Sequence, residues 1–226
     1  MRRIFLIFIL SVFCTAVHSE RVVLNVCTEL GSSYMTDFIG GGYVMSELNL
    51  APNVLYSGGL QKTTEKKIAA YLANEIKIPY KELEIRLMQQ FFYSSYVWNI
   101  RETMFIFVAG TKFGRFDTNL GASARVITPS GSFKNSIFER FNLQYDFGVS
   151  VFANPQKWNL RLGASNYDMF LFERIEAIMF SLKGDYSFSD KWGVFCKANL
   201  RPAGNFHLSA NYYSFYFQTG VRWAIF

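Results

Sequence analysis

The stretch from Phe215 to Ile225 constrains the fold more than any other, because its side chains alternate strictly in character. One phase consists of Phe215, Phe217, Thr219, Val221, Trp223 and Ile225. The other phase consists of Tyr216, Gln218, Gly220, Arg222 and Ala224. Because neighbouring side chains of a β-strand point to opposite faces, this period of two predicts a strand with one apolar face. That face must be covered by a protein core or by lipid.

The same period recurs through the C-terminal half, and the connections between its strands alternate in length. Alternating runs begin at Phe141, Trp158, Ile178 and Trp192. Short connections lie at 114–117, 153–156 and 189–190, and long ones at 128–136, 166–175 and 201–213. Short turns at one end and long loops at the other are typical of membrane barrels. A soluble sandwich would also alternate, so the alternation by itself leaves that fold open.

The composition favours a strand-built membrane protein. Aromatic residues make up 18% of the 226 residues and charged residues only 18%, with a formal net charge of +6. No interior segment has the roughly 20 consecutive apolar residues that a spanning helix requires. We therefore predict an all-β fold, a transmembrane antiparallel up-and-down β-barrel of about 10–12 strands, with an even strand number. The last strand should pair with the first, because an open edge in lipid would leave unpaired backbone groups.

The first 19 residues have the layout of a secretory signal peptide. Two arginines precede an apolar stretch from Ile4 to Phe13, and small and polar residues follow. We predict cleavage after Ser19 and one barrel domain over 20–226. Removing Arg2 and Arg3 leaves 21 basic against 17 acidic residues, a net charge of +4, which is too weak to indicate nucleic-acid binding. The expected location is the outer membrane of a Gram-negative bacterium.

The N-terminal half is less regular. Strands are expected at 21–28, 37–47, 54–62, 80–95 and 102–113, although the last of these is apolar on both phases for part of its length. The stretch 63–76 fits a helical face as well as a strand, and Pro79 would follow the end of such a helix. We predict a strand there, because lipid tolerates no unpaired backbone in a barrel wall.

Ionisable residues on the polar phase are expected to point into the barrel lumen. They are Glu82, Glu84, Arg86, Arg125, Asp146, Arg161, Lys183, Asp185, Lys197 and Arg222. Basic residues outnumber acidic ones in this set, so an open lumen would modestly favour anions. Alternatively, the charges neutralise one another and plug the barrel. Three tryptophans are expected in the membrane interface, where aromatic girdles lie: Trp158, Trp192 and Trp223.

The sequence predicts neither a metal site nor a cofactor. After cleavage one histidine and two cysteines remain, and Cys27 and Cys196 are too far apart in sequence to indicate a metal site or to establish a disulfide. The glycines of "FIGGGYV" do not form a phosphate-binding loop, because no Lys-Ser/Thr pair follows them. Expected partners are outer-membrane lipid and lipopolysaccharide, the barrel-assembly machinery and other envelope proteins.

One short motif raises the question of enzymatic activity. His207 and Ser209 in "NFHLSANYY" resemble part of the outer-membrane lipid A deacylases, in which a histidine base activates a serine nucleophile. In that family an acidic residue follows the serine. No Asp or Glu occurs after Asp190 here, so we predict that the chain is not an enzyme and keep lipid A modification as an alternative.

Two resemblances bear on the role of the protein. The region 137–226, ending "YSFSDKWGVF…GVRWAIF", resembles small outer-membrane barrels of Bacteroidetes-type bacteria. The segment 71–96, together with the late "NFHL…GVRW", is similar to the TraO-type barrel of conjugative transposons. These resemblances imply a non-enzymatic structural or interaction component, in a conjugation or envelope assembly. A narrow solute pore is the further alternative.

Overall fold

The computed structural model describes residues 21–33, 36–129, 135–152, 157–168, 170, 178–202 and 214–225. No helix long and apolar enough to cross a bilayer occurs among these residues. Twelve strands run along the chain: β1 (Arg21–Ser33), β2 (Thr36–Ala51), β3 (Val54–Thr63), β4 (Lys66–Tyr80), β5 (Leu83–Tyr96), β6 (Ile100–Phe113), β7 (Phe116–Pro129), β8 (Ile137–Ser150), β9 (Trp158–Ser165), β10 (Met179–Ser187), β11 (Trp192–Arg201) and β12 (Ser214–Ala224).

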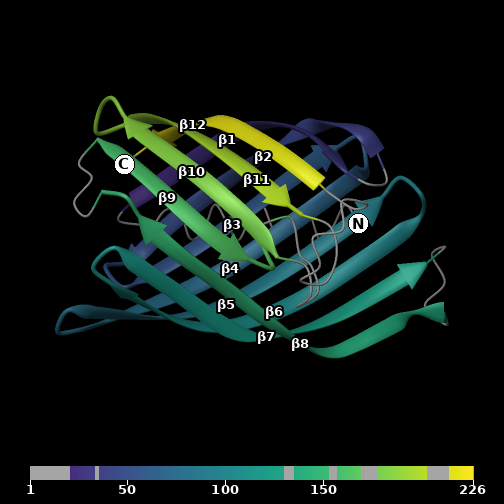
Figure 1. The fold of residues 1–226 in the computed structure, drawn as a ribbon, viewed down its shortest axis with the longest axis horizontal. Helices are drawn as coiled ribbons and strands as arrows, with labels where there is room; N and C mark the ends of the chain where they lie inside the picture. Colours follow the sequence, from purple (N-terminus) through teal and green to yellow (C-terminus); the bar gives the residue numbers. More distant parts are fainter. Residues whose placement is uncertain are drawn as a thin grey trace.

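The strands form one closed barrel in which each strand pairs with its neighbours along the chain (Figure 1). β1 and β12 close the wall by antiparallel pairing from Val23 opposite Ala224 to Ser33 opposite Ser214. The predicted all-β antiparallel barrel and the pairing of the last strand with the first are confirmed. The strand number is twelve, at the upper end of the expected range.

The stretch 63–76 belongs almost wholly to β4 and its turn rather than to a helix. β4 pairs with β3 from Val54 opposite Ile76 to Gln61 opposite Ala69, and with β5 along its whole length. Even Pro79 lies in the strand, opposite Glu84 and one residue from the strand's last pair. The hydrogen bonds of two neighbouring strands thus override the local helical pattern, as expected where lipid cannot satisfy backbone groups.

The two ends of the barrel differ in their connections. At the end that holds Arg21 and Ala224, which we call the short-turn end, β4 and β5 are joined by a two-residue turn, as are β6 and β7. At the opposite end, the loop end, long connections join β7 to β8, β9 to β10 and β11 to β12. The predicted rhythm is confirmed for the connections that follow β9, β10 and β11. It is wrong for β7–β9, because the connections 130–136 and 151–157 have the same length, and β1–β6 have short turns at both ends. By the usual rule, the short-turn end faces the periplasm.

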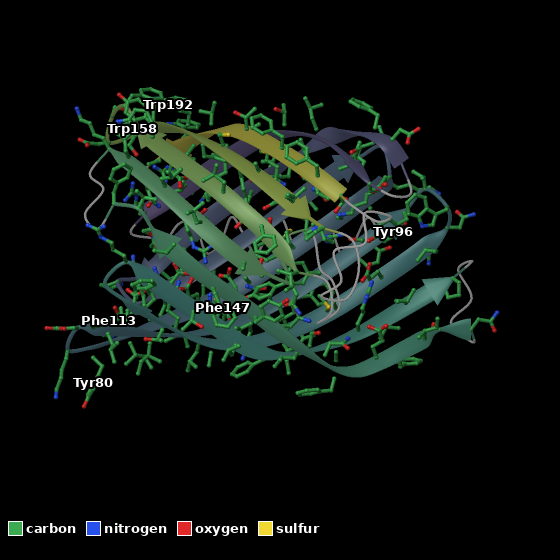
Figure 2. The ribbon with its side chains drawn as sticks, in the orientation of Figure 1. Tyr80, Tyr96, Phe113, Phe147, Trp158 and Trp192 are labelled. Atoms are coloured by element: carbon green, nitrogen blue, oxygen red, sulfur yellow. The ribbon has the colours of Figure 1, made fainter. Side chains whose placement is uncertain are left out.

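The outer wall is apolar and rich in aromatic side chains (Figure 2). Phe147, Leu162, Phe180 and Phe217 expose between 37% and 50% of their surface. Their neighbours on the other phase, such as Gln144, Ser181 and Gln218, are buried. The apolar phase therefore points outward to lipid, and this orientation excludes the sandwich, in which the same residues would form the core.

The two cysteines lie on opposite faces of the wall. Cys27 is buried on the inner face of β1, Cys196 is exposed on the outer face of β11, and both are free. A disulfide between them is therefore excluded in this fold.

Candidate functional site

The candidate site is a cavity of about 390 Å³ in the lumen. It extends from Lys112 and Ser150, close to the short-turn end, to Tyr167 and Asp168 deeper in the barrel. Its volume lies within the range of small-molecule sites, which is roughly 300–1,000 Å³. Five cationic and three anionic side chains line it: Arg86, Lys112, Arg161, Lys183, Lys197, Asp117, Asp146 and Asp168.

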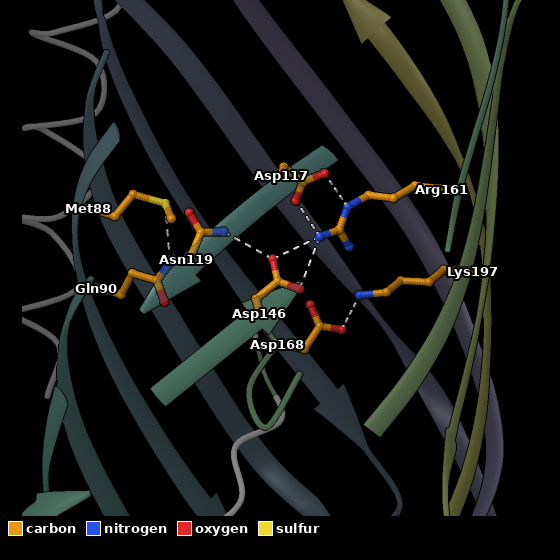
Figure 3. A network of polar contacts seen from close by, with 8 residues as sticks. All are labelled: Met88, Gln90, Asp117, Asn119, Asp146, Arg161, Asp168 and Lys197. Carbon is orange, nitrogen blue, oxygen red and sulfur yellow. Dashed lines mark hydrogen bonds and ion pairs between the residues drawn. The ribbon is translucent and has the colours of Figure 1, made fainter. Parts of the chain in front are cut away.

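Arg161 on β9 joins three neighbouring strands at the centre of this cavity (Figure 3). Its Nη2 donates to Asp117 Oδ1 at 2.6 Å and to Asp146 Oδ2 at 2.9 Å. Asn119 Nδ2 donates to the same Asp146 carboxylate at 3.1 Å. A guanidinium shared by two carboxylates forms strong charge-assisted bonds, so Arg161 holds β7, β8 and β9 in register from inside.

The described residues that follow β9, 166–168 and Phe170, lie in the lumen, although the long loops of membrane barrels usually extend outward. We call these residues the inward connection. Asn166, Tyr167 and Phe170 are buried. Asn166 accepts from the Tyr145 amide at 2.9 Å and donates to the Leu143 carbonyl at 2.8 Å. These two bonds fold its first residues against the inner wall. The alternation pattern could not show this, because it places residues only within strands.

Asp168 fixes the inward connection to β11, two strands along the wall from β9. Its Oδ2 accepts from Lys197 Nζ at 2.5 Å and from Asn199 Nδ2 at 3.4 Å, both on β11 (Figure 3). Burial raises the pKa of the neighbouring Tyr167 hydroxyl, which therefore stays neutral. The inward connection thus lies beside the cavity and is held there by an ion pair.

Aromatic rings separate the cavity from the loop end. The Phe170 ring lies 5.4 Å from that of Tyr43 and 5.9 Å from that of Tyr71, and Tyr71 also contacts Phe92 at 5.2 Å between centroids. Pairs at these distances pack closely and exclude water. The described residues therefore constrict the lumen between the cavity and the loop end.

A second polar network lies beyond these rings, nearer the loop end. Buried Lys66 donates to the Phe170 carbonyl at 2.6 Å and to Gln61 Oε1 at 3.1 Å. Gln61 and Gln218 both donate to the buried Glu29 carboxylate. Lys66 thus ties the inward connection to β1, β3 and β12, at a position that the sequence analysis did not select.

Not all cations of the cavity are engaged by acids. Arg86 has only a long contact of 3.9 Å with Glu84, and its buried Nε and Nη2 have no hydrogen-bond partner. Lys183 Nζ is 3.5 Å from Asp185 Oδ1, and Lys112 forms no hydrogen bond or ion pair with the residues that the structure describes. These three cations line the same cavity, so the electrostatic field inside that cavity attracts anions.

The other predicted lumen residues lie in two further places. Arg125 forms an ion pair with Glu102 and a longer one of 3.6 Å with Glu139, near the loop end. Arg222 Nη2 donates to Ser187 Oγ at 2.7 Å near the short-turn end. The prediction for Glu82 is wrong: this residue is exposed in the turn between β4 and β5, where Lys81 adopts a positive φ of 53° and the strand has already ended.

The three predicted interface tryptophans lie on the outer wall at the short-turn end. Trp158 begins β9 and Trp192 begins β11, both exposed (Figure 2). Trp192 stacks on Trp223 of β12, with 5.4 Å between ring centroids and an interplanar angle of 7°. Trp158 similarly contacts Tyr186 at 4.3 Å.

The proposed catalytic pair His207 and Ser209 lies outside the described residues, so lipid A modification stays an untested alternative. The described part of the chain holds no group of three or more His, Cys, Asp or Glu side chains that could bind a metal ion. The sequence analysis missed Asp117 because it assigned 114–117 to a turn, whereas β7 already begins at Phe116.

The comparisons place this barrel among outer-membrane folds. No family model matches the sequence, and no curated protein matches it. The translocator domain of the autotransporter NalP from Neisseria meningitidis has a similar structure, with a TM-score of 0.55, 14% identity and coverage of 94% of this chain and 92% of that chain. The KdgM porin in complex with disordered oligogalacturonate gives a TM-score of 0.55 at 6% identity, covering 90% and 99%.

The NanC porin also gives a TM-score of 0.55, at 9% identity, covering 88% of this chain and 98% of that chain. At these identities the likeness concerns the fold alone. The chain is thus a twelve-stranded barrel of the outer-membrane type. Its fold and apolar outer wall support the predicted location, the outer membrane of a Gram-negative bacterium.

Proposed function

We propose that this chain is a narrow outer-membrane channel for small anionic solutes, constricted by the inward connection, residues 166–168 and Phe170. The observation that carries the proposal is the cavity of about 390 Å³ with five cations against three acids in its lining. Two of those acids are occupied by Arg161 and the third by Lys197. Arg86 and Lys183 form only long ion pairs, with Glu84 and Asp185, and Lys112 forms none among the described residues. These three cations can therefore attract a carboxylate or phosphate.

Two of the similar folds, KdgM and NanC, are porins, which supports a channel of this architecture. Twelve strands enclose more room than the eight that side chains alone can fill, and less than the roughly sixteen of a wide aqueous porin. A narrow passage gated by an inward connection fits that intermediate size.

Planar-bilayer recording of the purified full chain tests the proposal. The wild type should conduct weakly and prefer anions in a salt gradient. The variant Asp168→Asn should conduct more, because it weakens the bond from Lys197 that holds the inward connection beside the cavity. If both proteins are silent after correct insertion, the channel proposal is wrong.

Charge variants test the preference for anions. Neutralising Arg86, Lys112 and Lys183 to glutamine should abolish the anion preference. The matched control neutralises Lys81, Lys157 and Lys191, which are exposed at the short-turn end and lie outside the cavity lining. An equal loss of selectivity in both variants would assign the preference to general surface charge instead.

The implied role in a conjugation or envelope apparatus remains a separate hypothesis. It rests on the resemblance of 71–96 to the TraO-type barrel, and neither a family model nor a curated relative supports it. Deleting the gene and measuring plasmid or transposon transfer would test it. For the enzymatic alternative, mass spectrometry of lipid A from cells with His207→Ala is the corresponding test.

A further inference from the structure

A hollow of about 350 Å³ lies in the outer wall over β1–β4, on the face that points to lipid. Four apolar side chains dominate its lining: Val26, Val44, Leu60 and Ile68. Gly42 lies among them, and a Cβ there would be 2.3 Å from the Cys27 carbonyl oxygen. The close pairing of β1 and β2 therefore requires glycine, and the missing side chain leaves the wall hollowed at this point.

Two lysines lie at the loop-end side of this hollow. Lys62 is the penultimate residue of β3, Lys67 is the second residue of β4, and both are exposed and line the hollow. Lys67 Nζ donates to Asn99 Oδ1 at 3.3 Å, and Lys62 has no hydrogen bond or ion pair among the described residues. None of the described residues that line the hollow is acidic. The positive charge of the two lysines is therefore not balanced by a carboxylate within the hollow.

The level of these lysines in the membrane indicates the chemistry of the occupant. Because the short-turn end faces the periplasm, the loop end lies at the outer leaflet. A lysine at that level lays its aliphatic stem on the apolar wall and holds its ammonium among lipid headgroups. An acyl chain fits the apolar hollow below, and a phosphate fits the two ammonium groups above.

We propose that this hollow is a binding site for one phosphorylated, multiply acylated lipid of the outer leaflet, the lipid A part of lipopolysaccharide. The acyl chain lies along Val44, Leu60 and Ile68, and a lipid phosphate binds Lys62 and Lys67. The site is on the outside of the wall and does not depend on whether the lumen conducts.

Native mass spectrometry of the full chain, titrated with purified lipid A in mild detergent, tests the proposal. The wild type should carry one tightly bound lipid A, and the affinity should fall about tenfold or more in Lys62→Gln/Lys67→Gln, since each cation near an anionic surface contributes roughly 1 kcal/mol. Lipid A from which the phosphates have been removed should bind the wild type as weakly as it binds this variant.

Two further variants separate the site from general effects. Lys157→Gln/Lys191→Gln removes the same charge at the short-turn end and should bind lipid A like the wild type. Val44→Trp fills the hollow from an exposed position and should weaken binding while both lysines remain. Retained affinity in the Lys62/Lys67 variant, or an equal loss in the Lys157/Lys191 variant, would overturn the proposal. Heat-modifiability on gels confirms that each variant is folded.

Discussion

The β1–β6 half and the β7–β12 half of the barrel share one apolar outer wall but differ on the inner face. Nine of the twelve buried residues in the interior apolar cluster belong to β1–β6, and Phe195 on β11 is the one from the strands of the other half. The inner face of β7–β12 instead carries Asn119, Gln144, Asp146, Arg161 and Lys183. The first half contributes the rings and aliphatic chains of this cluster and a polar network around Glu29, Gln61 and Lys66. The second half contributes mainly hydrogen bonds and charge.

This difference explains why the two halves differ in how clearly the sequence shows them. In β7–β12 a polar inner face alternates with an apolar outer face, so the period of two is plain. In β6, Met104, Ile106 and Val108 are buried inside, while Phe105 and Phe107 are exposed outside. Both phases are then apolar, and the alternation that identifies a strand is lost although the strand is regular.

The largest expected effect comes from removing the central cation of the polar half. Arg161→Ala leaves the carboxylates of Asp117 and Asp146 without their partner inside the barrel. Breaking a fully buried ion pair typically costs about 3–5 kcal/mol, and a loss toward the lower end is expected here, because these three side chains are 10–22% exposed. Urea unfolding of the reconstituted barrel measures the change. Lys183→Ala is the control, because its side chain is 44% exposed and its ion pair is long, and its stability should change little.

A slightly smaller loss is expected from the apolar half. Phe92 is 1% exposed and contacts the Tyr71 ring, so Phe92→Ala should lower the free energy of unfolding by about 3 kcal/mol. Phe91→Ala, at the adjacent outward position, should cost less because lipid fills the space it leaves. If Phe92→Ala and Phe91→Ala lowered the free energy of unfolding equally, the inner face of β1–β6 would not be a packed apolar interior.

Hydrogen bonds on the polar inner face should contribute less individually. Gln144 is fully buried and donates to Ser123 Oγ at 3.0 Å. Gln144→Ala removes that bond and should cost about 1–2 kcal/mol, measured by the same unfolding assay. A loss as large as that of Arg161→Ala would mean that the polar half is held by its amides rather than by its ion pairs.

The smallest effect is expected on the outer wall that both halves share. Trp192→Leu keeps an apolar side chain toward lipid but removes the stacking on Trp223. An aromatic pair contributes roughly 1 kcal/mol beyond its burial, and the loss should be of this size. Val194→Leu, at the next outward position of β11, is the control and should leave stability unchanged.

The sequence by itself determined the wall. The period of two, the alternating loop lengths and the charge-poor composition predicted an antiparallel membrane barrel closed by its last strand, because lipid satisfies no backbone group and only a closed sheet avoids an edge. The same requirement for paired backbone groups predicted the strand over 63–76, where the local pattern was ambiguous. The expected number of strands, about 10–12, includes the observed twelve.

Only the tertiary structure decided what fills the lumen. Residues such as Arg161, Asp117 and Asp168 come from different strands and a loop, and a period of two says which face a residue occupies but not which residue it meets across the barrel. Asp168 and Phe170 lie outside any strand, so no alternation could bring them inside. Their positions follow from contacts with Lys197 on β11 and Lys66 on β4, strands that the sequence alone does not bring together with this loop.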